Sequence, residues 1–148
     1  MGSVIASSVS AAREKALNYL GRFARTERQV KVYLQKKGFA ADEIKDAILF
    51  LREHRFLNDT SYAESFIQSK IHHGDGPLKI KQMLFQKGID SNTSNELVNS
   101  MYPQELQLEK AVELLQKRRS ATREKQIRFI ASRGFPRYVI IQALKRSQ

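Results

Sequence analysis

A short helical segment that ends in glycine occurs three times in this sequence, and it constrains the fold more than any other feature. The clearest copy is TERQVKVYLQKKGF, residues 26–39. Thr26 is a favourable N-cap residue and Gln29 completes a capping box, so a helix is predicted to begin here. Apolar residues then recur at helical spacing on one face. Gly38 is predicted to end the helix, because glycine readily takes the left-handed conformation after a last helical turn.

The other two copies end at Gly88 and Gly134, and the three glycines follow one another at intervals of 50 and 46 residues. The residues twelve positions before each glycine suit a helix start: Thr26, Gly76 and Thr122. Matching apolar pairs stand nine and ten positions after each glycine. Three copies in register, with almost no strand signal between them, predict an all-α protein of tandem helical units. We expect nine short helices in three groups of three.

The predicted organisation is a disordered N-terminal tail over residues 1–12, followed by three-helix units over residues 13–57, 58–102 and 103–148. The tail, MGSVIASSVSAA, is small and polar, and it lacks the basic and apolar segments of a signal peptide. No apolar run in the sequence approaches the roughly 18 residues that a membrane-spanning helix needs, so no membrane association is expected.

The net charge of +11 is unevenly distributed along the chain. Residues 1–59 hold 11 basic and 7 acidic side chains, residues 60–109 hold 4 and 6, and residues 110–148 hold 11 and 2. Most of the positive excess therefore lies in the last part of the chain. Such an excess favours polyanionic or acidic partners, but it does not choose between nucleic acid, an acidic protein and a membrane surface.

Catalytic and metal-binding motifs are missing from the sequence. It has no GxxxxGKS/T loop, no GxSxG elbow and no cysteine. Capping accounts for Asp59. His72, His73 and Asp75 resemble metal ligands, but adjacent side chains do not face one way on a helix and no further ligand has the usual spacing. We therefore expect no enzyme activity, no cofactor and no metal, and the lack of cysteine fits a cytoplasmic protein.

Several short motifs in the sequence are specific through their order and spacing rather than singly. They are Leu57-Asn58-Asp59-Thr60-Ser61-Tyr62-Ala63, Phe66, Gly74, Gly76-Pro77, Ile80, Leu84, Lys87-Gly88-Ile89, Arg128-Phe129 and Arg133-Gly134-Phe135. Together they resemble the RecX family, regulators of the bacterial RecA recombinase, and the resemblance extends from Arg13 to Arg146. The chain departs from the family at Asn58-Asp59, where two aspartates are typical, and at Ser61, where a basic residue is typical.

The resemblance implies three tandem three-helix units that form an elongated, curved body. It also implies binding to RecA, a position in the groove of the RecA filament on DNA, and inhibition of strand exchange and ATP hydrolysis in DNA repair and recombination. The expected partners are RecA and its filament, with weak electrostatic binding to single- or double-stranded DNA, and the chain is expected to be a monomer. Two alternatives stay open: a stand-alone basic helical nucleic-acid-binding protein, and a helical scaffold for an acidic protein.

Two basic clusters are candidate partner- or nucleic-acid-binding sites. The denser cluster comprises Lys117, Arg118, Arg119, Arg123, Lys125 and Arg128. The weaker cluster comprises Arg22, Arg25, Arg28 and Lys31. A single basic residue is commonly solvated surface, but the two clusters predict contact surfaces for phosphate or for an acidic filament wall. The aromatic residues of the repeat are predicted to lie in the core rather than to stack on bases: Tyr33, Phe39, Phe129 and Phe135.

Overall fold

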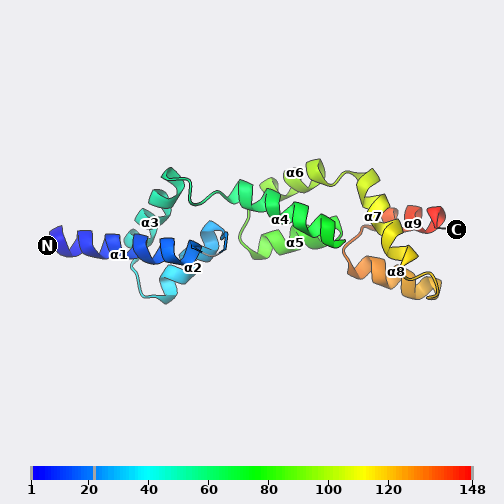
Figure 1. Ribbon diagram of the computed structural model, residues 1–148, viewed down its shortest axis with the longest axis horizontal. Coiled ribbons are helices and arrows are strands. Elements are labelled where there is room, and N and C mark those ends of the chain that lie inside the picture. Colours follow the sequence, from blue (N-terminus) through cyan, green and yellow to red (C-terminus); the bar gives the residue numbers. More distant parts are fainter. Residues whose placement is uncertain (1, 22, 148) are drawn as a thin grey trace. The chain divides into compact units, whose positions relative to one another are not determined.

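The computed structural model describes residues 2–21 and 23–147, with side chains from residue 8 onward, and over these residues it contains nine α-helices and no strand (Figure 1). The helices are α1 (Gly2–Leu20), α2 (Glu27–Lys36), α3 (Ala41–Glu53), α4 (Asp59–His73), α5 (Pro77–Gln86), α6 (Ser91–Met101), α7 (Gln104–Gln116), α8 (Arg123–Ser132) and α9 (Arg137–Arg146). The predicted all-α class is confirmed. None of the described helices combines the length and the apolar character of a bilayer-spanning segment.

A disordered tail was expected over residues 1–12, but in the structure α1 already begins at Gly2. Neither proline nor glycine interrupts the chain between Gly2 and Leu20, and alanine, the strongest helix former, recurs there. Ala12 and Ala16 are fully buried in the core that α1 shares with α3. Burial of these small residues therefore stabilises the part of α1 from Ala12 onward against the core.

The glycine-terminated helices have the predicted local geometry. Gly38, Gly88 and Gly134 have φ angles of +89°, +89° and +94°. Thr26 and Gln29 form the predicted capping box at the start of α2. The sequence pattern therefore determines both ends of α2, because the conformational requirement at each end is satisfied locally.

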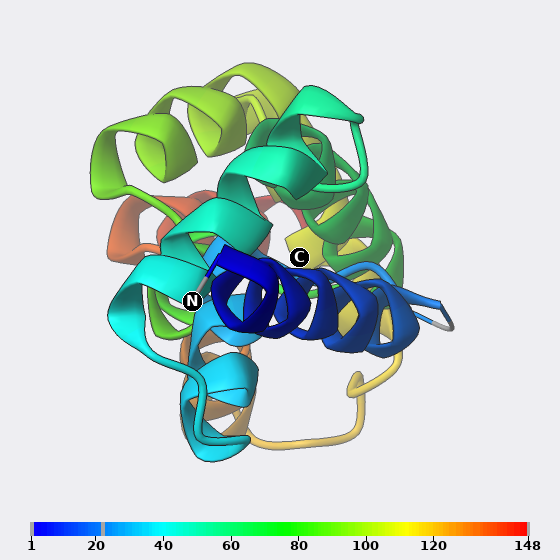
Figure 2. The same ribbon diagram turned by 90° about the vertical axis from the view of Figure 1, so that its left-hand side faces the viewer.

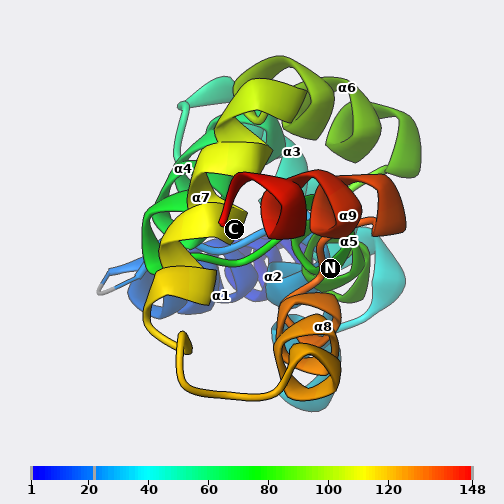
Figure 3. The same ribbon diagram turned by 90° about the vertical axis from the view of Figure 1, so that its right-hand side faces the viewer.

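The helices pack into two compact units, one of residues 1–62 with 87–89, and one of residues 63–86 with 90–148. In the first unit α1, α2 and α3 enclose an apolar core (Figure 2). Its buried residues are Ala12, Ala16, Val30, Leu34, Ile44, Ala47, Leu51 and Leu57. In the second unit α5 packs on α6, and α7, α8 and α9 pack on one another (Figure 3). The boundaries of three separate repeats stay a prediction.

One contact occurs once in each compact unit and joins a glycine turn to the start of an earlier helix. In the first unit, the Thr26 hydroxyl donates a hydrogen bond of 2.7 Å to the carbonyl oxygen of Lys87. In the second unit, the Gly76 N–H donates a hydrogen bond of 2.6 Å to the carbonyl oxygen of Arg133. Thr26 and Gly76 occupy the same position of the sequence repeat, as do Lys87 and Arg133. The repeat in the sequence thus corresponds to a repeated packing contact.

Replacing Thr26 by valine is expected to destabilise the protein by about 2 kcal/mol, because it removes a helix cap and takes from the Lys87 carbonyl the hydrogen bond of the fully buried Thr26 hydroxyl. Thr26→Ser keeps both hydrogen bonds and is expected to cost much less. Thr122→Val is the matched control: Thr122 caps α8 in the same way but is exposed, so its loss is expected to cost about 1 kcal/mol. Urea denaturation followed by circular dichroism measures all three. Equal costs for the two valine variants would contradict the role of the Lys87 contact.

Candidate functional site

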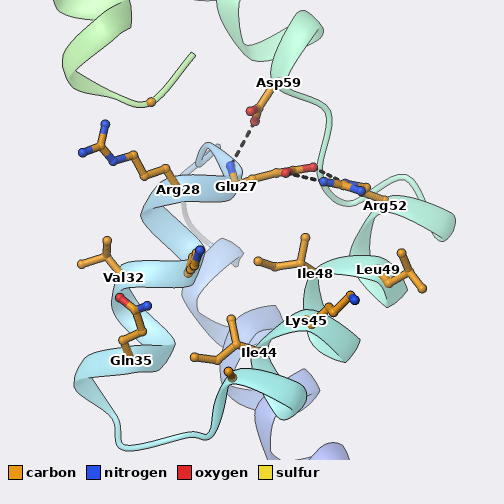
Figure 4. Close-up of a pocket in the computed structure, with 13 residues that line it drawn as sticks. Glu27, Arg28, Val32, Gln35, Ile44, Lys45, Ile48, Leu49, Arg52 and Asp59 are labelled. Carbon is orange, nitrogen blue, oxygen red and sulfur yellow. Dashed lines mark hydrogen bonds and ion pairs between the residues drawn. The ribbon is translucent and has the colours of Figure 1, made fainter. Parts of the chain in front are cut away.

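A groove of about 800 Å³ lies between α2 and α3 in the first unit (Figure 4). Ile44 and Ile48 extend from α3 towards α2 and form its floor. Val32 on α2 and Leu49 on α3 also line it, and they are 39% and 50% exposed. A floor of this kind offers apolar surface that a partner would remove from water.

The walls of the groove carry three basic side chains, Arg28 and Lys31 on α2 and Lys45 on α3. All three are exposed, and none forms an ion pair with another residue in the described part of the chain. Their charges are therefore available to a partner. Arg28 also contacts the second glycine turn, because a Cβ on Gly88 would lie 2.3 Å from the Arg28 Cδ.

The acidic groups at one end of the groove are already occupied. Glu27 accepts hydrogen bonds from the guanidinium of Arg52, one of them 2.6 Å long. Asp59 accepts a hydrogen bond of 3.0 Å from the backbone N–H of Glu27 (Figure 4). Burial raises the pKa of the Asp59 carboxyl above its ordinary value, although the Glu27 N–H acts in the opposite direction.

Capping accounts for Asp59, as expected, but the helix that it caps is not its own. Asn58 caps α4, because its side-chain oxygen accepts a hydrogen bond of 3.0 Å from the Ser61 N–H. Asp59 instead caps the start of α2, 32 residues earlier in the chain. This contact joins two segments far apart in sequence, so local motifs gave no signal of it.

The weaker basic cluster is divided by the fold. Arg22 lies outside the described residues. The Arg25 guanidinium lies 4.5 Å from the centre of the Tyr19 ring, and Tyr19 stacks on Tyr33 with ring centres 4.0 Å apart. Arg28 and Lys31 line the groove. Among the described members of this cluster, Arg28 and Lys31 are the two that meet at this surface, and the structure adds Lys45, which the sequence analysis did not select.

Part of the denser basic cluster lines a hollow of about 380 Å³ among α7, α8 and α9. Arg119 and Arg123 face this hollow beside the apolar residues Leu115 and Leu144. Arg146, which the sequence analysis missed, lies there as well, but its guanidinium binds Glu105 with an N–O distance of 2.9 Å. Arg119 and Arg123 form no ion pair with any described residue, so they are the free cations of the hollow.

The remaining members of the denser cluster lie outside this hollow. The Arg118 guanidinium stacks over Phe129 at 3.9 Å from the ring centre, and Arg128 lies 3.8 Å from a Glu124 oxygen. Lys117 is the C-cap residue of α7. Lys125 lies in the first turn of α8 and is exposed. A sequence count of basic residues does not distinguish such paired or stacked side chains from free ones.

His72, His73 and Asp75, which resembled metal ligands, do not form a group of three acidic or histidine ligands in the described residues. Asp75 is 1% exposed. Its carboxylate oxygens lie 3.3 Å from Lys79 Nζ, 3.5 Å from an Arg133 nitrogen and 3.4 Å from His73 Nδ1. The carboxylate is therefore surrounded by basic side chains, and its role in this fold is structural.

These features define a class, an all-α protein of three-helix units with exposed cationic surfaces. Residues 12–51 match the model of the first three-helix domain of RecX, and residues 58–97 match the model of the second. The chain belongs to the RecX family. It is a regulatory protein and not an enzyme.

Relatives of known sequence and structure agree with this assignment. Regulatory protein RecX of Clostridium botulinum (strain Eklund 17B / Type B) is 33% identical over 145 residues, which cover 91% of this chain and 68% of the relative. Its counterpart in Lactococcus lactis subsp. cremoris (strain MG1363) is 38% identical over 104 residues, 69% of this chain and 39% of the relative. The crystal structure of RecX from Lactobacillus salivarius matches with a TM-score of 0.84 and 28% identity, and the match covers 96% of this chain and 97% of that one.

Proposed function

We propose that this protein binds RecA and RecA–DNA filaments and inhibits their recombinase and ATPase activities, thereby modulating DNA repair and recombination. The observation that carries the proposal is the pair of unpaired arginines, Arg119 and Arg123, that line a hollow among α7, α8 and α9 in a chain of the RecX family. A polyanionic filament supplies the negative charge that these side chains lack within the protein.

The electrostatic part of this binding is expected to depend strongly on salt. Each phosphate contact steepens the dependence of log K on log salt concentration by about one unit. DNA alone would be bound weakly, because the free arginines are few. The protein would act as a monomer in the cytoplasm, where RecA filaments form.

A stand-alone nucleic-acid-binding protein is the alternative function, and the net charge of +11 favours it. The two functions differ in stoichiometry. A filament regulator acts at a small fraction of the RecA concentration, whereas a DNA-binding protein acts only when it covers the DNA, and excess competitor DNA removes its effect.

The double variant Arg119→Glu/Arg123→Glu tests the proposal. In the single-stranded-DNA-dependent ATPase assay of RecA, it is expected to need at least about tenfold more protein than the wild type for half-inhibition, because two favourable charge contacts become repulsive. The matched control, Lys15→Glu/Arg137→Glu, makes the same change in net charge at two exposed residues away from the hollow. Inhibition by the first double variant at wild-type concentrations, with helix content intact, would overturn the site assignment.

A further inference from the structure

The groove between α2 and α3 has a chemical character that differs from the arginine-lined hollow. Its exposed apolar residues are Val32 and Leu49, and its free cations are Arg28, Lys31 and Lys45. A phosphate backbone would satisfy the cations but would leave the apolar floor in contact with water or with polar atoms. The groove therefore suits a ligand that combines apolar side chains with negative charge.

The placement of the charges specifies this ligand further. Basic side chains stand on both walls, two on α2 and one on α3, and the apolar floor lies between them. The acidic groups of the groove are occupied by partners within the protein, Glu27 by Arg52 and Asp59 by the Glu27 N–H. The net charge that a ligand meets is thus positive on either side of an apolar strip.

We propose that this groove binds an acidic amphipathic helical segment of a protein partner. The apolar stripe of the segment would pack on Ile48, Leu49 and Val32, and acidic residues on its two flanks would pair with Lys31, Lys45 and Arg28. Recognition of one amphipathic helix in a groove formed by two others uses ordinary helix packing and requires no rearrangement of the fold. This inference rests on the proposed function, which supplies the protein partner. It deepens that function by giving the chemistry of one segment of the partner.

A synthetic peptide tests the groove without RecA. The probe is a fluorescein-labelled 16-residue peptide of glutamate, leucine and alanine, with leucine at positions i, i+3, i+4 and i+7 and glutamate on both flanks. Its control is a peptide of the same composition in an order that destroys the apolar stripe. Fluorescence anisotropy is expected to show saturable binding of the first peptide, and salt is expected to weaken it. The second peptide is expected to bind at least tenfold more weakly, because the loss of one apolar contact alone changes the dissociation constant by about a factor of ten.

Two variants and two matched controls locate the binding. Leu49→Asn removes exposed apolar surface from the lining of the groove, and Lys31→Glu/Lys45→Glu reverses the charge of both walls. Each change is expected to weaken binding at least about tenfold. Phe85→Asn and Lys15→Glu/Lys36→Glu make the same changes in apolar surface and in net charge at exposed residues outside the groove, and they are expected to change affinity less than about twofold. Circular dichroism confirms that all four variants keep their helix content.

The outcomes are distinct. Equal binding by the groove variants and their controls would overturn the proposal, as would equal binding of the two peptides, which would indicate charge attraction alone. Binding of a single-stranded oligonucleotide that is weakened by Leu49→Asn, without binding of the peptide, would assign the groove to nucleic acid instead. Because the peptide assay contains no RecA, failure of the RecA inhibition assay leaves the result for the groove unaffected.

Discussion

Gly134→Ala is expected to destabilise the second unit by about 4 kcal/mol, from left-handed backbone strain and from overpacking. Gly134 has φ +94°, and a Cβ added there would lie 2.4 Å from the Cβ of Lys79 and 2.6 Å from its backbone nitrogen. A backbone atom cannot move aside as the end of a side chain can. Movement of the turn would also break the hydrogen bond of 2.9 Å that the Leu78 N–H donates to the Gly134 carbonyl.

The three repeat glycines form a graded series that separates the two causes. Gly38 has nearly the same φ, +89°, but a Cβ there meets nothing within 4 Å, so Gly38→Ala is expected to cost only about 1 kcal/mol. At Gly88 a Cβ would lie 2.3 Å from the Arg28 Cδ, which can rotate away, but also 2.5 Å from the Arg28 Cβ, which cannot, so the expected cost is about 3 kcal/mol. Urea denaturation followed by circular dichroism gives the three values. A cost at Gly134 no greater than that at Gly38 would show that the turn does not pack tightly on the start of α5.

The sequence predicts those parts of the fold whose causes are local. The capping box at Thr26 and the left-handed glycines follow from requirements that a few neighbouring residues meet. The close approach of Gly134 to Lys79 does not follow from such local requirements, because it depends on the packing of residues far apart in sequence. The repeat of the glycine spacing shows that such contacts exist but not which residues make them.

The candidate surfaces were predictable in composition but not in geometry. The sequence places Arg118, Arg119 and Arg123 in one cluster, yet Arg118 stacks on Phe129 while the other two face a hollow. Lys45 stands apart from any basic run, and only the pairing of α2 with α3 brings it to the groove. Charge density along a chain therefore identifies the region of a candidate interface, and side-chain packing decides which charges in it are free.

Asp75→Asn is expected to destabilise the second unit by about 3 kcal/mol, because it leaves the side chains of Lys79 and Arg133 close together without the buried carboxylate that neutralises them. Asp75 is 1% exposed, whereas the side chains of Lys79 and Arg133 are 35% and 21% exposed. Their partial exposure keeps the expected cost at the lower end of the range for a broken buried ion pair. The backbone carbonyl of Asp75 still accepts the hydrogen bond of 2.9 Å from the buried Tyr102 hydroxyl, so the asparagine variant tests the charge and not the backbone contact.

A double-mutant cycle with Lys79→Met distinguishes charge neutralisation from a simple loss of packing. Methionine keeps most of the apolar length of the lysine side chain and removes its charge. If the carboxylate neutralises Lys79, then Asp75→Asn costs about 1 kcal/mol less in the Lys79→Met background than in the wild type. Arg133 is left unchanged because it also donates a hydrogen bond of 2.9 Å to the His73 carbonyl. Urea denaturation of the four proteins gives the coupling energy. A value near zero would show that Lys79 does not depend on Asp75 and that the cost of Asp75→Asn arises at its other basic neighbours, Arg133 and His73.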